Sequence, residues 1–73
     1  MIDKQDIAKN IGASLRAFRM KRGLSMQQLA TLAEIEKSQI YRIENGKVDV
    51  RISTLCVLAE ALNINIAELL SQP

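Results

Sequence analysis

The stretch "EKSQIYRIENG", residues 36–46, decides how this chain of 73 residues is understood. Ile40 and Ile43 lie three residues apart, which is the spacing of one buried face of a helix. The other side chains of the stretch are mostly polar or basic, and Asn45-Gly46 is typical of a helix end. The stretch is therefore predicted to form a short surface helix, residues 37–45. Its polar, positively charged side faces either plain water or a partner.

A complete helix-start signal precedes this stretch. Ser25 can cap a helix, Gln28 can reach back to close a capping box, and Leu24 and Leu29 can form the hydrophobic staple around it. The pattern predicts a helix over residues 26–33 and a tight turn at 34–35. Two short helices joined by about three residues cross steeply and leave the second on the surface. A free, basic, helical ridge of this kind fits the width of the B-DNA major groove.

The remaining apolar spacing is also helical. It predicts a helix over residues 4–21, capped by Asp3 and stopped at Gly23, that buries Ile7, Ile11, Leu15 and Phe18. A helix over residues 52–62 is predicted to bury Leu55, Leu58, Ala59 and Leu62. Asn65 and Glu68 repeat the capping box at the start of a fifth helix, where Ile64 can staple to Leu69. No segment has the two-residue period of a strand, so the fold class predicted is all-α, in a single domain over residues 1–73.

Composition narrows the setting. One cysteine, Cys56, cannot form an internal disulfide, and no signal peptide precedes the first helical pattern, so a cytoplasmic protein is expected. No apolar run approaches the roughly 18 residues that cross a bilayer, so no membrane partner is expected. Cys56 lies within the fourth helical pattern and is expected to be a small buried or half-buried side chain.

Charge is unevenly distributed along the chain. Residues 16–51 carry eight Lys or Arg and four Asp or Glu, whereas residues 52–73 carry only two Glu. A basic surface of this kind suits a polyanion. Charge alone leaves open the alternative of a solvated surface of mixed charge.

Four segments together resemble one known family: "LRAFRMKRGLS" (15–25), "LA" (29–30), "SQIYRIENGK" (38–47) and "LAEALNINIAELL" (58–70). In order and spacing they resemble the phage-repressor-like helix-turn-helix domains of XRE, or Cro/repressor, type. The resemblance implies a compact five-helix, lambda-repressor-like domain that binds double-stranded operator DNA, usually as a two-fold homodimer on a palindromic site. The third helix would enter the major groove and the second would lie across the DNA backbone.

Carried over position by position, the resemblance implies three groups of residues. The first reads base edges: Glu36, Lys37, Ser38, Tyr41 and Arg42. The second contacts phosphates: Ser25, Met26, Gln27, Gln28, Gln39, Asn45, Lys47 and Arg51. The third is an internal ion pair between Arg19 and Glu44 that orients the helices. Lys and Arg suit the O6 and N7 acceptors of guanine, and a helix N-terminus suits a phosphate.

Three positions depart from the family pattern. Met26 stands where Gln is usual, which removes one side-chain contact to phosphate. Glu34 stands where the turn commonly has Gly, which costs about 1 kcal/mol if the residue is left-handed. Glu36 replaces the usual Ser or Thr, and its charge repels phosphate unless it accepts a hydrogen bond from a cytosine amino group. The operator is therefore expected to differ from those of relatives.

Four large aliphatic residues near the C-terminus are more than one short helix needs for docking. Part of this cluster is expected to form the dimer interface, and the alternative is that all four complete the monomer core. The residues are Ile64, Ile66, Leu69 and Leu70.

Other functions find less support in the sequence. An enzyme is not expected, because the chain has no histidine, no metal-ligand cluster and no glycine-rich phosphate loop. No catalytic residue, cofactor, metal or small-molecule ligand is predicted. A protein-interaction module or antitoxin-like adaptor with the same fold remains an alternative, as does the DNA-binding portion of a larger regulator. The nearly end-to-end match favours a protein that acts alone, and the sequence does not distinguish repression from activation.

Overall fold

The computed structural model describes residues 2–71, so the ends of the predicted domain, residues 1 and 72–73, lie outside the described part. The described residues form helices and connecting loops with no strand, which confirms the all-α class. The helices are α1 (Lys4–Lys21), α2 (Met26–Ala33), α3 (Lys37–Glu44), α4 (Ile52–Leu62) and α5 (Ile66–Leu70). These bounds confirm the predicted ones, except that Asn45 caps α3 instead of belonging to it.

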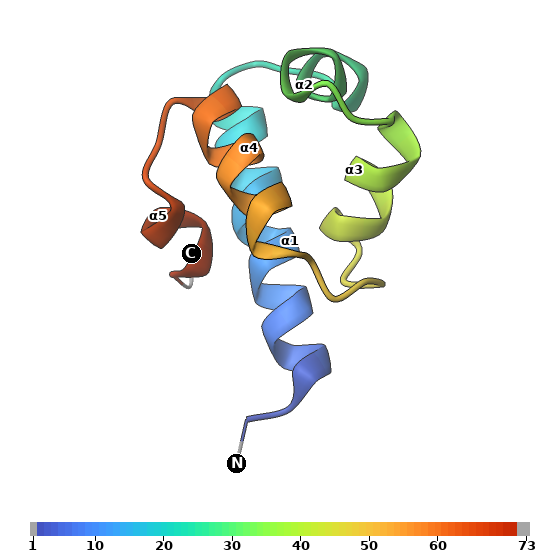
Figure 1. Cartoon of the computed structure of the whole chain (residues 1–73), viewed down its shortest axis with the longest axis vertical. Helices are drawn as coiled ribbons and strands as arrows, with labels where there is room; N and C mark the ends of the chain where they lie inside the picture. Colours follow the sequence, from blue (N-terminus) through green and yellow to red (C-terminus); the bar gives the residue numbers. More distant parts are fainter. Residues whose placement is uncertain (1, 72–73) are drawn as a thin grey trace.

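The long helix α1 runs along the length of the molecule, and α4 overlies part of it in the view of Figure 1. The α2–α3 pair lies to one side of these two helices and α5 lies to the other. The core between them consists almost entirely of aliphatic side chains: Ile11, Leu15, Leu29, Ala30, Ala33, Ile40, Ile43, Leu55, Leu58, Ala59, Leu62 and Leu69. None of the described helices has the length and the apolar character that crossing a membrane requires.

Local signals explain where the helices start and stop. The side chain of Asp3 accepts a hydrogen bond from the Gln5 N–H at 2.9 Å, which confirms the predicted cap of α1. Gly23 follows α1 with a φ of +69°, a left-handed conformation that glycine adopts without cost. Glu34 and Asn63 adopt the same conformation at the ends of α2 and α4, with φ of 57° and 56°. The tight turn predicted at residues 34–35 thus has Glu34 in the left-handed conformation, which costs about 1 kcal/mol for a non-glycine residue.

A glycine lets α1 and α3 approach each other closely. A Cβ atom added to Gly12 would clash with the carbonyl oxygen of Ile43 and would lie 2.8 Å from that of Glu44. Any larger residue would therefore push the C-terminal end of α3 away from α1. Gly12 sets the distance between the central helix and the surface helix.

Two of the predicted burials are wrong. Ile7 is 45% exposed, because the first turns of α1 extend beyond the core that buries Ile11 and Leu15. Cys56 is exposed as a free thiol, because the buried side of α4 runs through Leu55, Leu58, Ala59 and Leu62 and leaves position 56 outside it.

The C-terminal helix α5 is fixed to the core by apolar packing and to α1 by a hydrogen bond. Leu69 is completely buried in the monomer, and the Ser14 hydroxyl donates a 2.7 Å hydrogen bond to the carbonyl oxygen of Ser71. Leu69 therefore belongs to the monomer core, and its predicted place in a dimer interface is wrong. Leu70 is 49% exposed, and Ile64 and Ile66 are partly buried.

Candidate nucleic-acid interface

The two sides of α3 differ sharply in environment. Ile40 and Ile43 point inward and are 0% and 1% exposed. All four predicted base-reading residues within the helix are exposed, namely Lys37, Ser38, Tyr41 and Arg42. The polar side of residues 37–42 therefore faces outward from the molecule.

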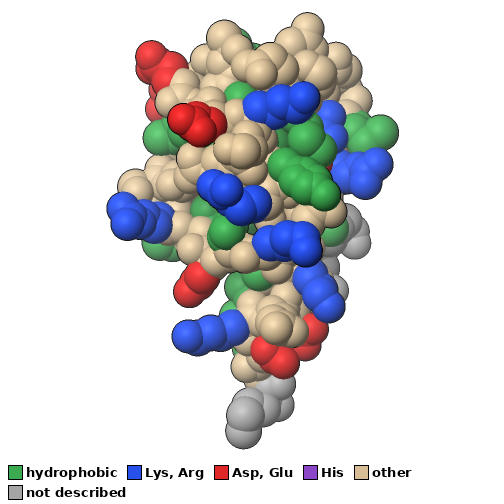
Figure 2. Space-filling view, turned by 90° about the vertical axis from the view of Figure 1, so that its right-hand side faces the viewer, with side chains coloured by type: hydrophobic (Ala, Val, Ile, Leu, Met, Phe, Trp, Pro, Cys, Tyr) green, Lys and Arg blue, Asp and Glu red, His purple; other side chains and the backbone are tan. Residues whose placement is uncertain are grey.

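This face is rich in positive charge. Figure 2 shows the molecule from the side on which α2 and α3 lie, with Lys and Arg side chains spread over most of its length. Acidic side chains lie mainly toward the margins of this view. In residues 2–71 the structure has a single ion pair, and it does not involve any of the exposed cations of α3. Among the described residues, these cations therefore have no carboxylate partner within 4.0 Å.

The ion pair between Arg19 and Glu44 connects the inward side of α3 to α1. Arg19 of α1 donates two hydrogen bonds to Glu44, from Nε to Oε2 at 2.6 Å and from Nη2 to Oε1 at 3.0 Å. A third, from Nη1 to the carbonyl oxygen of Leu24, measures 2.8 Å. The hydrogen bonds to Glu44 raise the pKa of the Arg19 guanidinium. The predicted pair is present, and it connects α1, the loop before α2 and the end of α3.

The start of α2 is closed by its own side chains. The Gln28 N–H donates to Ser25 Oγ at 3.0 Å, and the Ser25 N–H donates to Gln28 Oε1 at 2.8 Å. The predicted capping box is thus complete. Within residues 2–71, the N–H groups of Met26 and Gln27 have no protein acceptor. These two donors and the positive end of the helix dipole can receive a phosphate.

The start of α3 is open. Glu36 caps the helix through its backbone only, since its exposed carboxylate makes no capping hydrogen bond. The carboxylate is therefore free to reach outward beside Lys37.

The exit of α3 brings several predicted phosphate contacts together. The Asn45 amide donates to the carbonyl oxygen of Tyr41 at 2.8 Å, and Gly46 turns the chain with a φ of +66°. Gln39, Arg42 and Arg51 line one hollow of about 220 Å³ between α3 and the start of α4. Lys47 is exposed beside it. Arg42, a base-reading candidate, thus lies along the same edge as the phosphate candidates Gln39, Lys47 and Arg51.

A family model described as helix-turn-helix matches residues 15–69. The chain belongs to the XRE-type helix-turn-helix family. Its relatives are transcriptional regulators, so it is a DNA-binding regulator and not an enzyme.

Two curated relatives illustrate the range of lengths in this family. The chain is 33% identical over 67 residues to the control protein C.SmaI of Serratia marcescens, an alignment that covers 92% of this chain and 80% of that protein. It is 46% identical over 57 residues to the transcriptional repressor RghR of Bacillus subtilis, covering 77% of this chain and 42% of the repressor. The chain thus spans less than half of the repressor's length.

Solved structures agree with the fold. The hypothetical transcription factor NHTF from Neisseria superimposes with a TM-score of 0.90 at 25% identity, covering 100% of this chain and 84% of that one. The restriction-modification controller protein C.AhdI from Aeromonas hydrophila gives a TM-score of 0.83 at 34% identity, covering 85% of this chain and 94% of that one.

The structure also shows helix-turn-helix features that the sequence pattern did not reveal. Gly12 seats α3 against α1, and the only signal for it was a glycine inside an otherwise helical pattern. Met26 is half-buried against the core, so at this position only the backbone N–H faces outward. Lys4 and Lys9 lie beside the exit loop of α3, far from it in the sequence.

Proposed function

We propose that the chain binds a two-fold symmetric DNA operator as a homodimer, with α3 of each copy in the major groove, and so regulates transcription. The main observation in support of this proposal is the outward face of α3. Its cations form no ion pair within residues 2–71, while its inward face is held by two buried isoleucines and by the Arg19–Glu44 pair. A rigid helix with a free polar side matches the requirements for reading base edges.

Each group of residues has a distinct part in this proposal. Lys37 and Arg42 donate to guanine O6 and N7, and Glu36 accepts from a cytosine amino group. Tyr41, with 48% of its surface exposed, contacts a thymine methyl group or a phosphate, and Ser38 tolerates several bases.

Phosphates on both sides of the groove hold the helix in place. The free N–H groups of Met26 and Gln27 bind one phosphate at the start of α2, where the Ser25 hydroxyl and the Gln28 amide group can donate further bonds. Gln39, Asn45, Lys47 and Arg51 bind the backbone at the other end of α3. Contacts of this kind set position and carry no sequence information.

The homodimer is proposed to form through the exposed part of the C-terminal region. Leu70 is half-exposed, and the partly buried Ile64 and Ile66 extend the apolar surface around it. A closed two-fold dimer would place its recognition helices about 34 Å apart, one turn of DNA. Two half-sites at that spacing are therefore the expected form of the operator.

The test is repeated selection from a library of random duplexes by three proteins: wild type, Arg42→Glu and the matched control Lys21→Glu. Lys21 is an exposed cation in the last turn of α1, outside the proposed interface. We expect wild type and the control to select the same two-fold motif and Arg42→Glu to select none. If wild type selects no motif and all three proteins bind DNA equally weakly, the domain is a protein-binding module and the proposal fails.

A further inference from the structure

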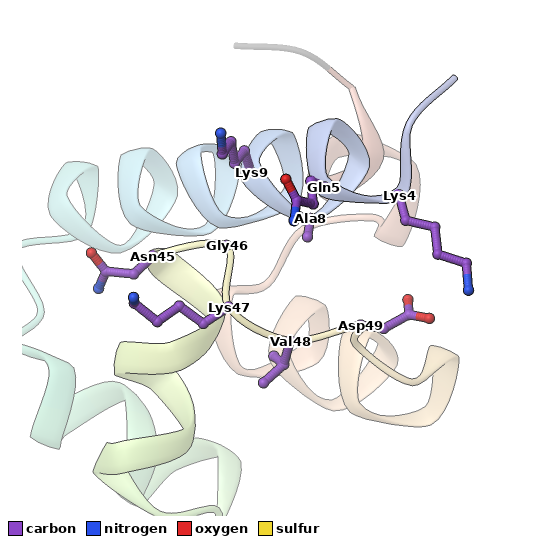
Figure 3. Close-up of a pocket in the computed structure, with 9 residues that line it drawn as sticks. All are labelled: Lys4, Gln5, Ala8, Lys9, Asn45, Gly46, Lys47, Val48 and Asp49. Atoms are coloured by element: carbon purple, nitrogen blue, oxygen red, sulfur yellow. The ribbon is translucent and has the colours of Figure 1, made fainter. Parts of the chain in front are cut away.

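An open groove lies between the first turns of α1 and the loop that connects α3 to α4. It has a volume of about 440 Å³. Lys4, Lys9 and Ala8 line it from α1, and Asn45, Lys47 and Asp49 line it from the loop (Figure 3). The groove brings side chains that are about forty residues apart in the sequence into one site.

Close backbone contact fixes the two walls of the groove relative to each other. A Cβ atom added to Gly46 would lie 2.8 Å from Lys9 Cγ and 3.1 Å from Lys9 Cα, so the loop rests directly on α1. The contact at Gly12 supports the end of α3 in the same way, less than one turn further along α1. The groove therefore needs little rearrangement to accept a ligand.

The charge of the groove is positive and is not neutralised by the protein. Lys4, Lys9 and Lys47 line it together with one carboxylate, that of Asp49. Figure 3 shows the Lys4 and Asp49 side chains at the same end of the groove. Neither they nor the other two lysines form an ion pair within 4.0 Å, since the pair in residues 2–71 is Arg19–Glu44. An excess of unpaired ammonium groups favours a bound anion.

The position of the groove indicates which anion. Asn45 and Lys47 line it and also belong to the proposed phosphate contacts at the exit of α3. In Figure 2, Lys and Arg side chains continue from the α2–α3 region toward the narrow end of the molecule, where acidic side chains also lie. Figure 1 shows this end to be the start of α1. The cations of residues 2–15 are Lys4 and Lys9. A DNA strand, which repeats a phosphate every 3.4 Å or so along its axis, can continue along this line.

We propose that this groove binds the DNA backbone outside the major-groove contacts, with Lys4 and Lys9 contacting phosphates that flank the one bound by Lys47. The proposal rests on the proposed function and extends the DNA surface bound by each copy. Asp49 opposes the binding, so the chain's own carboxylate limits the affinity of the site.

The test compares wild type, the double variant Lys4→Gln/Lys9→Gln and the control Lys21→Gln on two duplexes with the selected operator. One duplex has long flanks and the other ends directly outside the half-sites. Lys21 is at the other end of α1, about 25 Å from Lys4, so its substitution controls for the loss of one positive charge.

The slope of log K against log salt is negative. On the long duplex, we expect it to be less steep for the double variant by about 1.8, or 0.9 for each lost phosphate contact. Between 50 and 200 mM salt, the wild type should then lose roughly tenfold more affinity than the double variant. On the short duplex the two proteins should bind alike. Asp49→Asn should bind the long duplex more tightly than wild type does.

Other outcomes separate this inference from the function on which it rests. If the double variant keeps the wild-type slope on the long duplex while Arg42→Glu still loses binding, the groove is not a DNA site and the proposed function stands. A slope reduced equally on both duplexes would also overturn the inference, because it would place the lysines over the operator itself. If Arg42→Glu binds as wild type does, both proposals fail.

Discussion

The two helices of the helix-turn-helix, α2 and α3, have the same length of eight residues but very different N-termini. The start of α2 is closed by reciprocal hydrogen bonds between Ser25 and Gln28, so few donors remain for DNA. The start of α3 has no side-chain cap, and within residues 2–71 neither Lys37 in its first turn nor Arg42 in its last turn forms an ion pair. Side chains thus cap the start of α2, whereas no side chain caps the start of α3.

The difference indicates a division of work. The donors at the start of α2 bind phosphate in the same way at every sequence, whereas free side chains on α3 can distinguish bases. Recognition of base edges also requires that α3 be rigid. Helix α1 supports α3 through the close approach at Gly12 and through the Arg19–Glu44 pair.

The largest expected effect comes from removing that support. Arg19→Leu leaves the Glu44 carboxylate, whose side chain is 2% exposed, buried without a partner. Breaking a buried pair in this way should lower the free energy of unfolding by about 3 kcal/mol, measured by urea denaturation. Arg16→Leu, at an exposed arginine of the same helix, should change it by less than about 0.5 kcal/mol. An equally small effect of Arg19→Leu would contradict the assigned role.

An intermediate effect is expected at Gly12. Alanine in a helix interior is favoured over glycine by about 0.5–1 kcal/mol, but the overlap with the Ile43 and Glu44 carbonyls should cost about 1–3 kcal/mol. Gly12→Ala should therefore destabilise the protein by about 1 kcal/mol and weaken operator binding, because α3 is displaced. Ala13→Gly, at the exposed neighbour, measures helix propensity alone. A Gly12→Ala protein more stable than wild type would show that α1 and α3 can separate freely.

An effect no larger than that of Gly12→Ala is expected when the two helix starts are compared directly. Ser25→Ala removes the cap of α2 and should cost about 1 kcal/mol of unfolding free energy in thermal or urea unfolding. Glu36→Ala removes no capping hydrogen bond from α3 and should leave stability nearly unchanged. Equal losses from both substitutions would mean that the start of α3 is not open.

The helices were predictable because their signals are local. The capping box at Ser25, the left-handed turn at Glu34 and the aliphatic spacing of α4 each depend on residues close together in the chain. The Arg19–Glu44 pair lies 25 residues apart and was predicted only through the family resemblance.

Features that depend on packing between distant segments escaped prediction. The pattern of residues 7–18 could not show that Ile7 lies beyond the core, because that limit is set by where α3 and α5 pack against α1. In the same way, four apolar residues near the C-terminus could not show that Leu69 fills the monomer core while Leu70 remains exposed. The groove at Lys4 and Lys9 required the position of the α3–α4 loop.

The division of work between α2 and α3 can be measured on the selected operator and on each of its single base-pair variants. Arg42→Ala removes a side chain of α3. Met26→Pro removes one free N–H at the first position of α2, where proline is tolerated, and Met26→Ala controls for the lost side chain. We expect Arg42→Ala to lose about 1–3 kcal/mol of discrimination at one base pair per half-site. Met26→Pro should weaken binding to all sites by one common factor relative to Met26→Ala. If Arg42→Ala instead weakens every site equally, α3 does not read sequence at this position and the central claim is wrong.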